Sequence, residues 1–186
     1  MMMKSIDINT NNGTIILPNR YPVSPSLTQE VFRNGEMFSK AQSRTYGTFP
    51  WIHYSFPGGM VTGRNLLVNL CFYDQVVVYT TLNVDFYPPG PKDWSDYSLD
   101  VEAETKQFHD SILDKILGKP TESDLLPNLN LDAAHEILAR PLKWCFQWGT
   151  VLSSHDFKGG GTYITVSYGN RREQATREYW KKSPGQ

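Results

Sequence analysis

The sequence predicts an α+β fold: an antiparallel sheet built from hairpins, with one long and one short helix packed on it and a helix at the C-terminus. Runs of β-branched and aromatic residues, divided by short turns, occur before residue 88 and again after residue 141. Between these runs lies one long segment with helical periodicity. With 186 residues, 39% of them hydrophobic, the chain has the size of one ordinary domain with its own core. We therefore expect a single domain over residues 1–186, with a Pro-rich connector at 88–91 inside it.

The first half of the chain predicts paired strands and one ambiguous segment. The step Asn12-Gly13 supplies the positive φ angles of a tight hairpin turn, and Tyr73-Asp74-Gln75 joins two strongly apolar runs. Three prolines between residues 18 and 25 predict an extended, irregular passage. The segment 27–41 has apolar residues at helical spacing, but the step Asn34-Gly35 interrupts it. The predicted strands are 6–9, 14–17, 51–56, 66–72 and 76–82.

The second half predicts three helices. A long helix begins after Ser98, a suitable N-cap, and ends at Gly118. A shorter helix is predicted over 132–139, and a polar helix over 170–182 that docks through Tyr179-Trp180. The predicted apolar face of the long helix is Val101, Thr105, Phe108, Ile112 and Ile116. Its carboxylates are expected on a solvated face.

A last hairpin is predicted between the strands 142–152 and 162–168, joined by a glycine-rich loop. On the first of these strands Trp144, Phe146 and Trp148 would share one face. The two cysteines, Cys71 and Cys145, each lie in an apolar run. We expect both to be small buried core residues rather than a disulfide.

Composition excludes several classes of protein. Eighteen Lys and Arg against nineteen Asp and Glu leave a net charge of −1, which does not attract the whole chain to nucleic acid or to an anionic membrane. No uninterrupted apolar run opens the chain, so we expect neither a secretory signal nor a membrane anchor, and a cytoplasmic location. The apolar stretch 66–82 is broken by polar residues and fits a hairpin better than a membrane span.

No motif predicts a metal, cofactor or catalytic site. The histidines, His53, His109, His135 and His155, have no second ligand at a metal-binding spacing. The run Ser153-Ser154-His155-Asp156 places a hydroxyl, an imidazole and a carboxylate side by side, but neighbouring residues on a strand end point to opposite sides, so a polar turn fits better than a triad. The glycines at 159–161 precede a strand and not a helix, which favours a hairpin tip over a phosphate loop.

Charge is unevenly distributed along the chain. Residues 93–136 hold eleven acidic residues and three lysines, a net charge of −8, and residues 140–186 hold eight basic and three acidic residues, a net charge of +5. The basic C-terminal helix could contact phosphates, but the acidic segment would repel nucleic acid, so nucleic-acid binding is a weaker interpretation than protein binding. The acidic helix and the hairpin tip instead indicate a surface that binds a protein partner. The candidate partner-binding residues are Asp96, Glu102, Glu104, Asp110, His155, Phe157 and Lys158.

One stretch of the sequence resembles a known family. The run Lys143-Trp144-Cys145-Phe146-Gln147-Trp148-Gly149-Thr150-Val151, followed by Ser154-His155-Asp156 and a strand ending in Tyr168, is similar to a pattern in small α+β immunity proteins of bacterial polymorphic and type VI secreted toxins. The resemblance covers about the final quarter of the chain, together with the order of strands, helix and strands. It implies a cytoplasmic, non-enzymatic protein that binds one cognate toxin and occludes its active site.

Two hypotheses of different classes follow. In the first, the chain binds and neutralises a toxin; if that toxin is a nuclease, the acidic segment would meet its basic groove by charge complementarity. In the alternative, the chain is a small hydrolase-type enzyme that uses His53 or His109 with a helix carboxylate and Ser153 or Ser154 in a cleft. An enzyme requires a sheltered pocket where such groups converge, whereas a binding protein requires a broad surface with exposed aromatic side chains.

Overall fold

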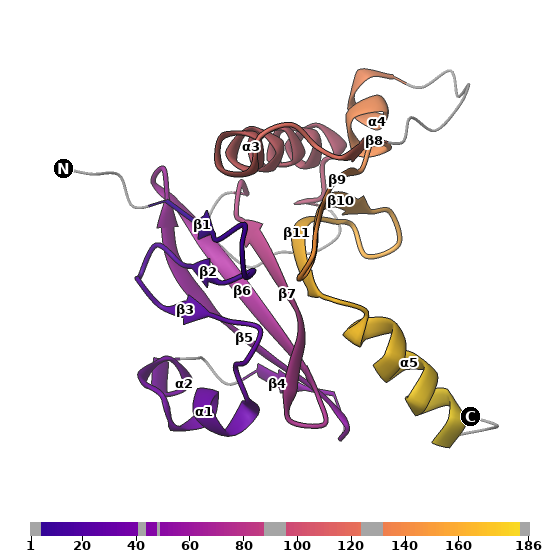
Figure 1. Cartoon of the computed structure of the whole chain (residues 1–186). Coiled ribbons are helices and arrows are strands. Elements are labelled where there is room, and N and C mark those ends of the chain that lie inside the picture. Colours follow the sequence, from indigo (N-terminus) through magenta and orange to yellow (C-terminus); the bar gives the residue numbers. More distant parts are fainter. Residues whose placement is uncertain (1–4, 41–43, 48, 88–95, 124–131, 183–186) are drawn as a thin grey trace.

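The structure is a computed structural model that describes residues 5–40, 44–47, 49–87, 96–123 and 132–182 (Figure 1). Its α+β class is the one predicted from the sequence. Within the described residues, eight strands form one antiparallel sheet in the order β4-β5-β6-β7-β11-β10-β9-β8, and three short strands form a second sheet, β1-β2-β3. The Pro-rich connector predicted at 88–91 lies outside the described residues.

The strands of the large sheet are β4 Arg44–Tyr46, β5 Trp51–Val61, β6 Arg64–Tyr73, β7 Val76–Val84, β8 Glu122–Ser123, β9 Leu142–Phe146, β10 Gly149–Asp156 and β11 Gly161–Tyr168. The small sheet consists of β1 Asp7–Ile8, β2 Ile15–Ile16 and β3 Pro22–Val23. The helices are α1 Gln29–Asn34, α2 Glu36–Lys40, α3 Leu99–Leu117, α4 Ala133–Leu138 and α5 Arg171–Lys182.

Local signals explain the best-predicted elements. The β6–β7 hairpin turns at Asp74-Gln75, where both residues have positive φ (46° and 72°), the geometry that brings two twisted strands back together. Helix α3 begins at the predicted cap, since the Ser98 hydroxyl accepts a hydrogen bond from the Val101 amide, and ends at Gly118 with φ 75°. The ambiguous segment 27–41 forms two short helices, α1 and α2, separated at Gly35.

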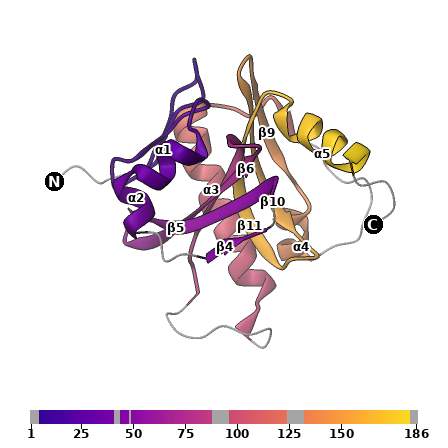
Figure 2. The same ribbon diagram turned by 90° about the horizontal axis from the view of Figure 1, so that it is seen from below.

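One face of the large sheet carries the hydrophobic core. The small sheet packs Ile8 and Ile15 against it, α1 contributes Phe32, and α3 contributes Leu113, all buried. Helix α5 belongs to the other face, where Ala175 forms a separate small cluster with Tyr73 and Val78. Seen from below, α1 and α2 lie at one side of the molecule and α5 at the opposite side (Figure 2).

Several local predictions were wrong. Helix α5 docks through Ala175, with Tyr179 packed beside it, whereas Trp180 of the predicted docking pair is 57% exposed. Strand β5 does not stop at Pro57 but continues to Val61 through a register shift between Pro57 and Gly59, because a bulge accommodates a proline that cannot donate to the ladder. The strand predicted over 142–152 is two strands, β9 and β10, which turn at Gln147-Trp148 and pair with each other. Cys145 is exposed, whereas Cys71 is buried as predicted, and both are free thiols.

Candidate functional site

The predicted partner-binding residues gather at the end of the sheet where α3 begins and the β10–β11 hairpin turns. Phe157 at the hairpin tip is 54% exposed, and Asp96, Glu104 and Lys158 are exposed as well. Asp110 is half-buried and lies six residues further along α3 than Glu104. We call these five residues the α3–tip surface.

Glu102 and His155 do not belong to that surface, because both are buried. Glu102 is 4% exposed and His155 9%, so the expectation of a solvated face was wrong for Glu102. The carboxylate lies in the first turn of α3, where the helix packs on β10 and β11, and this packing excludes it from water. Neither side chain can touch a partner directly in this arrangement.

Together these two residues form a buried polar cluster that joins the hairpin to α3. His155 Nδ1 donates to the Thr162 hydroxyl (3.0 Å), which donates in turn to the Glu102 carbonyl (3.4 Å). Nε2 then accepts from the Tyr97 hydroxyl at 3.3 Å. Burial lowers the pKa of His155, although Glu102, with its carboxylate 3.7 Å from Nδ1, acts in the opposite direction. The imidazole is therefore neutral at pH 7, and the cluster positions Phe157, whose ring packs edge-on to His155 at 4.7 Å.

Two other carboxylates of α3 are held by cations of the chain itself. Lys106, with a fully buried side chain, donates to both oxygens of Asp110 at 2.7 Å. Glu104 lies 3.6 Å from the Arg64 guanidinium, in a pair that is largely exposed. The Asp110 pair is consequently part of the packing of α3, while Glu104 remains accessible to a partner.

The face that α3 buries overlaps the predicted apolar one only in part: Thr105 is buried as predicted, and Phe108, Ile112 and Ile116 pack half-buried against the core. Its fully buried residues are Glu102, Ala103, Thr105, Lys106, His109 and Leu113, while Val101, Phe108, Ile112 and Ile116 are half-buried. Thr105, Lys106 and His109 each have a hydrogen-bond partner on the sheet or on α3. Glu102 Oε2 and His109 Nδ1 have none among the described residues. Because this buried face contains several polar residues, the helical spacing of apolar residues in the sequence does not reveal it.

The groups of the alternative enzymatic hypothesis do not converge. His109 is fully buried, and its Nε2 accepts a hydrogen bond from the Val84 amide at 3.2 Å. Burial, together with the nearby Lys106 charge, lowers the pKa of His109 to about 3. His53 lies on the opposite face of the sheet, stacked on Tyr46 at 4.7 Å, and Ser153 is buried in the core. Within the described ranges, no three His, Cys, Asp or Glu side chains gather as metal ligands.

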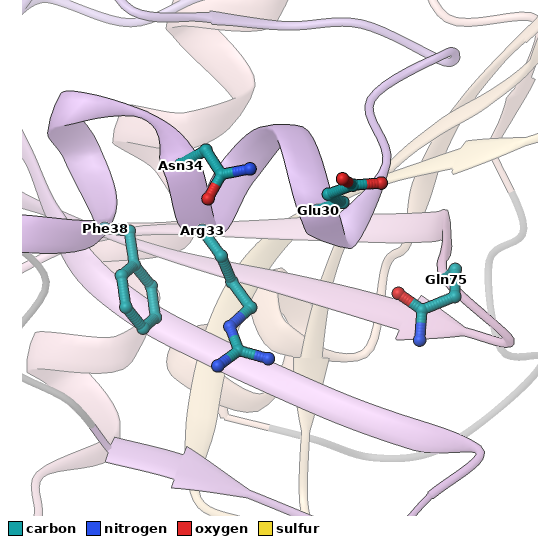
Figure 3. Close-up of a pocket in the computed structure, with 5 residues that line it drawn as sticks. All are labelled: Glu30, Arg33, Asn34, Phe38 and Gln75. Carbon is teal, nitrogen blue, oxygen red and sulfur yellow. The ribbon is translucent and has the colours of Figure 1, made fainter.

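A hollow of about 480 Å³ lies beside the β6–β7 turn, and its residues were not predicted as a site. It is lined by Glu30, Arg33, Asn34, Phe38 and Gln75 (Figure 3). The Arg33 guanidinium lies 5.8 Å from the centre of the Phe38 ring. The two short helices place these side chains opposite Gln75, since the Gln29 amide donates to the Gln75 carbonyl at 2.8 Å. Mixed charge and an open shape suit a protein surface better than a small-molecule pocket.

Comparison with known proteins identifies a relative in fold. No protein-family model matches the chain, and no curated protein matches it in sequence. Among solved structures, a chain of "Rhs1-CT in complex with cognate immunity protein RhsI1" superimposes with a TM-score of 0.54 and 12% sequence identity. The match covers 96% of this chain and 97% of that chain. The predicted resemblance to immunity proteins is thus supported by a likeness in fold over nearly the whole chain, not only its final quarter.

None of the described helices is long and apolar enough to cross a membrane.

Proposed function

We propose that this chain is an immunity protein that binds a cognate bacterial toxin and neutralises it. The observation that carries the proposal is the likeness in fold, over 96% of the chain, to a chain of a complex that contains an immunity protein. At 12% identity the likeness concerns the fold, so the toxin-binding role of this chain is our inference. As finer parts of the same proposal, the chain acts in the cytoplasm and the toxin belongs to a type VI or related polymorphic secretion system.

The α3–tip surface is the proposed contact with the toxin. Phe157 supplies an exposed aromatic anchor, a residue type enriched at interfaces. The carboxylates of Asp96 and Glu104 supply negative charge that would speed association with the basic groove of a nuclease. Glu102 and His155 are buried beneath this surface and hold the hairpin tip in place.

Geometry gives the hydrolase alternative little support. Glu102 and His155 are the carboxylate and imidazole that come together, but both are buried and the imidazole nitrogens already have partners. Catalysis needs such a pair in a cleft that admits substrate.

The proposal is tested by co-expressing the chain with the products of neighbouring genes. We expect one product to be toxic alone, harmless with this chain, and stoichiometric with it after purification. If no neighbour is toxic, or if the toxic product is neither bound nor neutralised, the proposed function is wrong.

The contact surface is tested by charge reversal once the toxin is known. Asp96→Lys with Glu104→Lys should lower the association rate about tenfold at low salt and flatten its dependence on salt. Asp110 is left unchanged because it holds the buried Lys106. The matched control, Asp7→Lys with Glu30→Lys, reverses two exposed charges elsewhere. Equal rates for both variants would exclude the acidic contact.

A further inference from the structure

A second hollow lies on the other side of the β6–β7 turn, between the turn and helix α5. It has a volume of about 280 Å³, and we call it the α5 hollow. Its lining residues are Tyr73, Asp74, Val76, Val78, Arg171, Gln174, Ala175 and Glu178.

The walls of the α5 hollow are held firmly. Ala175 is 4% exposed and packs against Tyr73 and Val78. The Arg171 guanidinium donates to the carbonyls of Pro25 (2.6 Å) and Val77 (3.1 Å). These contacts fasten the first turns of α5 to the sheet, so the hollow exists before any partner arrives.

The lining of the hollow combines aliphatic and acidic side chains. Val76, Val78 and Ala175 supply aliphatic surface, and Val76 is still 38% exposed. The side chains of Asp74 and Glu178 have neither an ion pair nor a hydrogen bond in the described part of the chain. With Arg171 already bound to two carbonyls, the three ionised side chains leave a net charge of −1.

Tyr73 provides an independent indication of a ligand. The residue is only 8% exposed, lines the hollow, and has a hydroxyl with no hydrogen-bond partner among the described residues. Eight buried side-chain atoms lack a hydrogen-bond partner among the described residues, and Tyr73 is the one of these residues that lines the hollow. A buried hydroxyl without a partner costs free energy. An incoming N–H donor would supply the missing partner.

We propose that the α5 hollow receives one arginine side chain of the cognate toxin, an inference that rests on the proposed function. The aliphatic part of arginine would lie on the valines, as long cationic side chains do on apolar surface. Its guanidinium has five N–H donors, enough for the Asp74 and Glu178 carboxylates and the Tyr73 hydroxyl. The volume lies below the range of small-molecule pockets, about 300–1,000 Å³, and arginine is enriched among the residues that dominate binding energy.

The α5 hollow and the α3–tip surface lie at opposite ends of strand β7. Nine residues at about 3.4 Å each separate the two by roughly 30 Å. This is close to the diameter of a domain of about 100 residues. Because α3 packs on the core face of the sheet and α5 on the other face, a toxin of that size reaches both sites only by wrapping around the sheet.

The first test uses the arginine probe N-acetyl-arginine N′-methylamide and does not need the toxin. Titrated into the ¹⁵N-labelled protein, it should shift the amide signals of Asp74, Gln174 and Glu178 saturably, with a dissociation constant of roughly 1–10 mM. The uncharged citrulline analogue should bind at least about tenfold more weakly. Equal binding of the two probes, or no saturable shift at these amides, overturns the proposal.

Variants then assign the binding groups. Asp74→Asn keeps a residue that tolerates the positive φ of the turn, and combined with Glu178→Gln it should weaken the arginine probe about tenfold. Tyr73→Phe should also weaken it without lowering the melting temperature, because the lost hydroxyl has no partner in the described protein. Glu173→Gln, an uncharging change on the same helix outside the hollow, is the control and should change nothing.

The second test measures toxin affinity for the same variants. The Asp74→Asn/Glu178→Gln variant should bind the toxin about 10–100-fold more weakly than Glu173→Gln does. If the toxin binds both variants equally, the arginine pocket is wrong and the proposed function stands. If the probe binds in the hollow but no toxin partner is found, the proposed function is wrong. The hollow then binds arginine, but the arginine does not come from a toxin.

Discussion

His109 should make the stability of this protein depend on pH in a way that one substitution removes. The imidazole is fully buried between α3 and the sheet, and it accepts the Val84 amide proton at the end of β7. Burial and the nearby Lys106 charge lower its pKa to about 3. In the unfolded chain the same group titrates at about 6.5. Below that pH the unfolded state binds a proton that the folded state does not, so stability falls as the pH is lowered and stops falling near pH 3.

The magnitude follows from the two pKa values. Each pH unit between them costs about 1.4 kcal/mol. Lowering the pH from 7.5 to 5 therefore costs about 2 kcal/mol from this residue alone, and the figure holds for any folded-state pKa below about 4.5. Against a total stability of about 5–15 kcal/mol this is a large change.

The comparison that isolates His109 uses His109→Gln, whose amide oxygen can accept the Val84 amide proton in place of Nε2. Urea unfolding at pH 7.5 and pH 5 gives the free energy lost by each protein. Because the other titratable groups are the same in both proteins, their contributions cancel. The difference between the free energies of unfolding that the two proteins lose is therefore due to His109. We expect the variant to lose about 2 kcal/mol less than the wild type. If both lose the same amount, the buried neutral histidine is refuted.

Three further substitutions test the packing. Arg171→Ala removes two hydrogen bonds to carbonyls. It should lower the free energy of unfolding in urea by about 2–3 kcal/mol and expose α5 to proteolysis. The control is Arg177→Ala, whose side chain is 76% exposed; it should change the free energy of unfolding by less than about 0.5 kcal/mol. Trp144→Phe removes the indole donor to the Gly118 carbonyl (2.8 Å) and should cost about 1–2 kcal/mol; an unchanged urea midpoint would contradict this role. Gly13→Ala places a Cβ 2.4 Å from the Trp148 ring at a φ of 75° and should cost about 1–3 kcal/mol with a shift in tryptophan fluorescence; unaltered fluorescence would show that the ring has room.

Much of the secondary structure was predictable because its signals are local. The Ser98 cap and the Gly118 stop bound α3 as expected, and the pair of β6 and β7 follows from two β-branched runs around a short turn. Asp132 caps α4 through the His135 amide, again a local hydrogen bond. Such features depend on neighbours within four residues, which the sequence displays directly.

The candidate site was predicted only in part, because burial depends on contacts distant in sequence. Phe157 and Glu104 are exposed as expected. Glu102 and His155 are buried because they meet each other across 53 residues of chain, together with Thr162 and Tyr97. The α5 hollow has no signal in the sequence, since Asp74 and Glu178 are ordinary charged surface residues until α5 folds beside the turn.

The sequence by itself determined the α+β class, the hairpins and the helix limits, because hydrophobic period, turn residues and caps act over short distances. Gly13 shows where that reasoning ends. Its turn is predicted by Asn12-Gly13, but the need for glycine also comes from the Trp148 ring that covers it, 135 residues further along the chain. Only the tertiary structure decided which polar residues are buried and where hollows form, because these depend on which distant surfaces exclude water from one another.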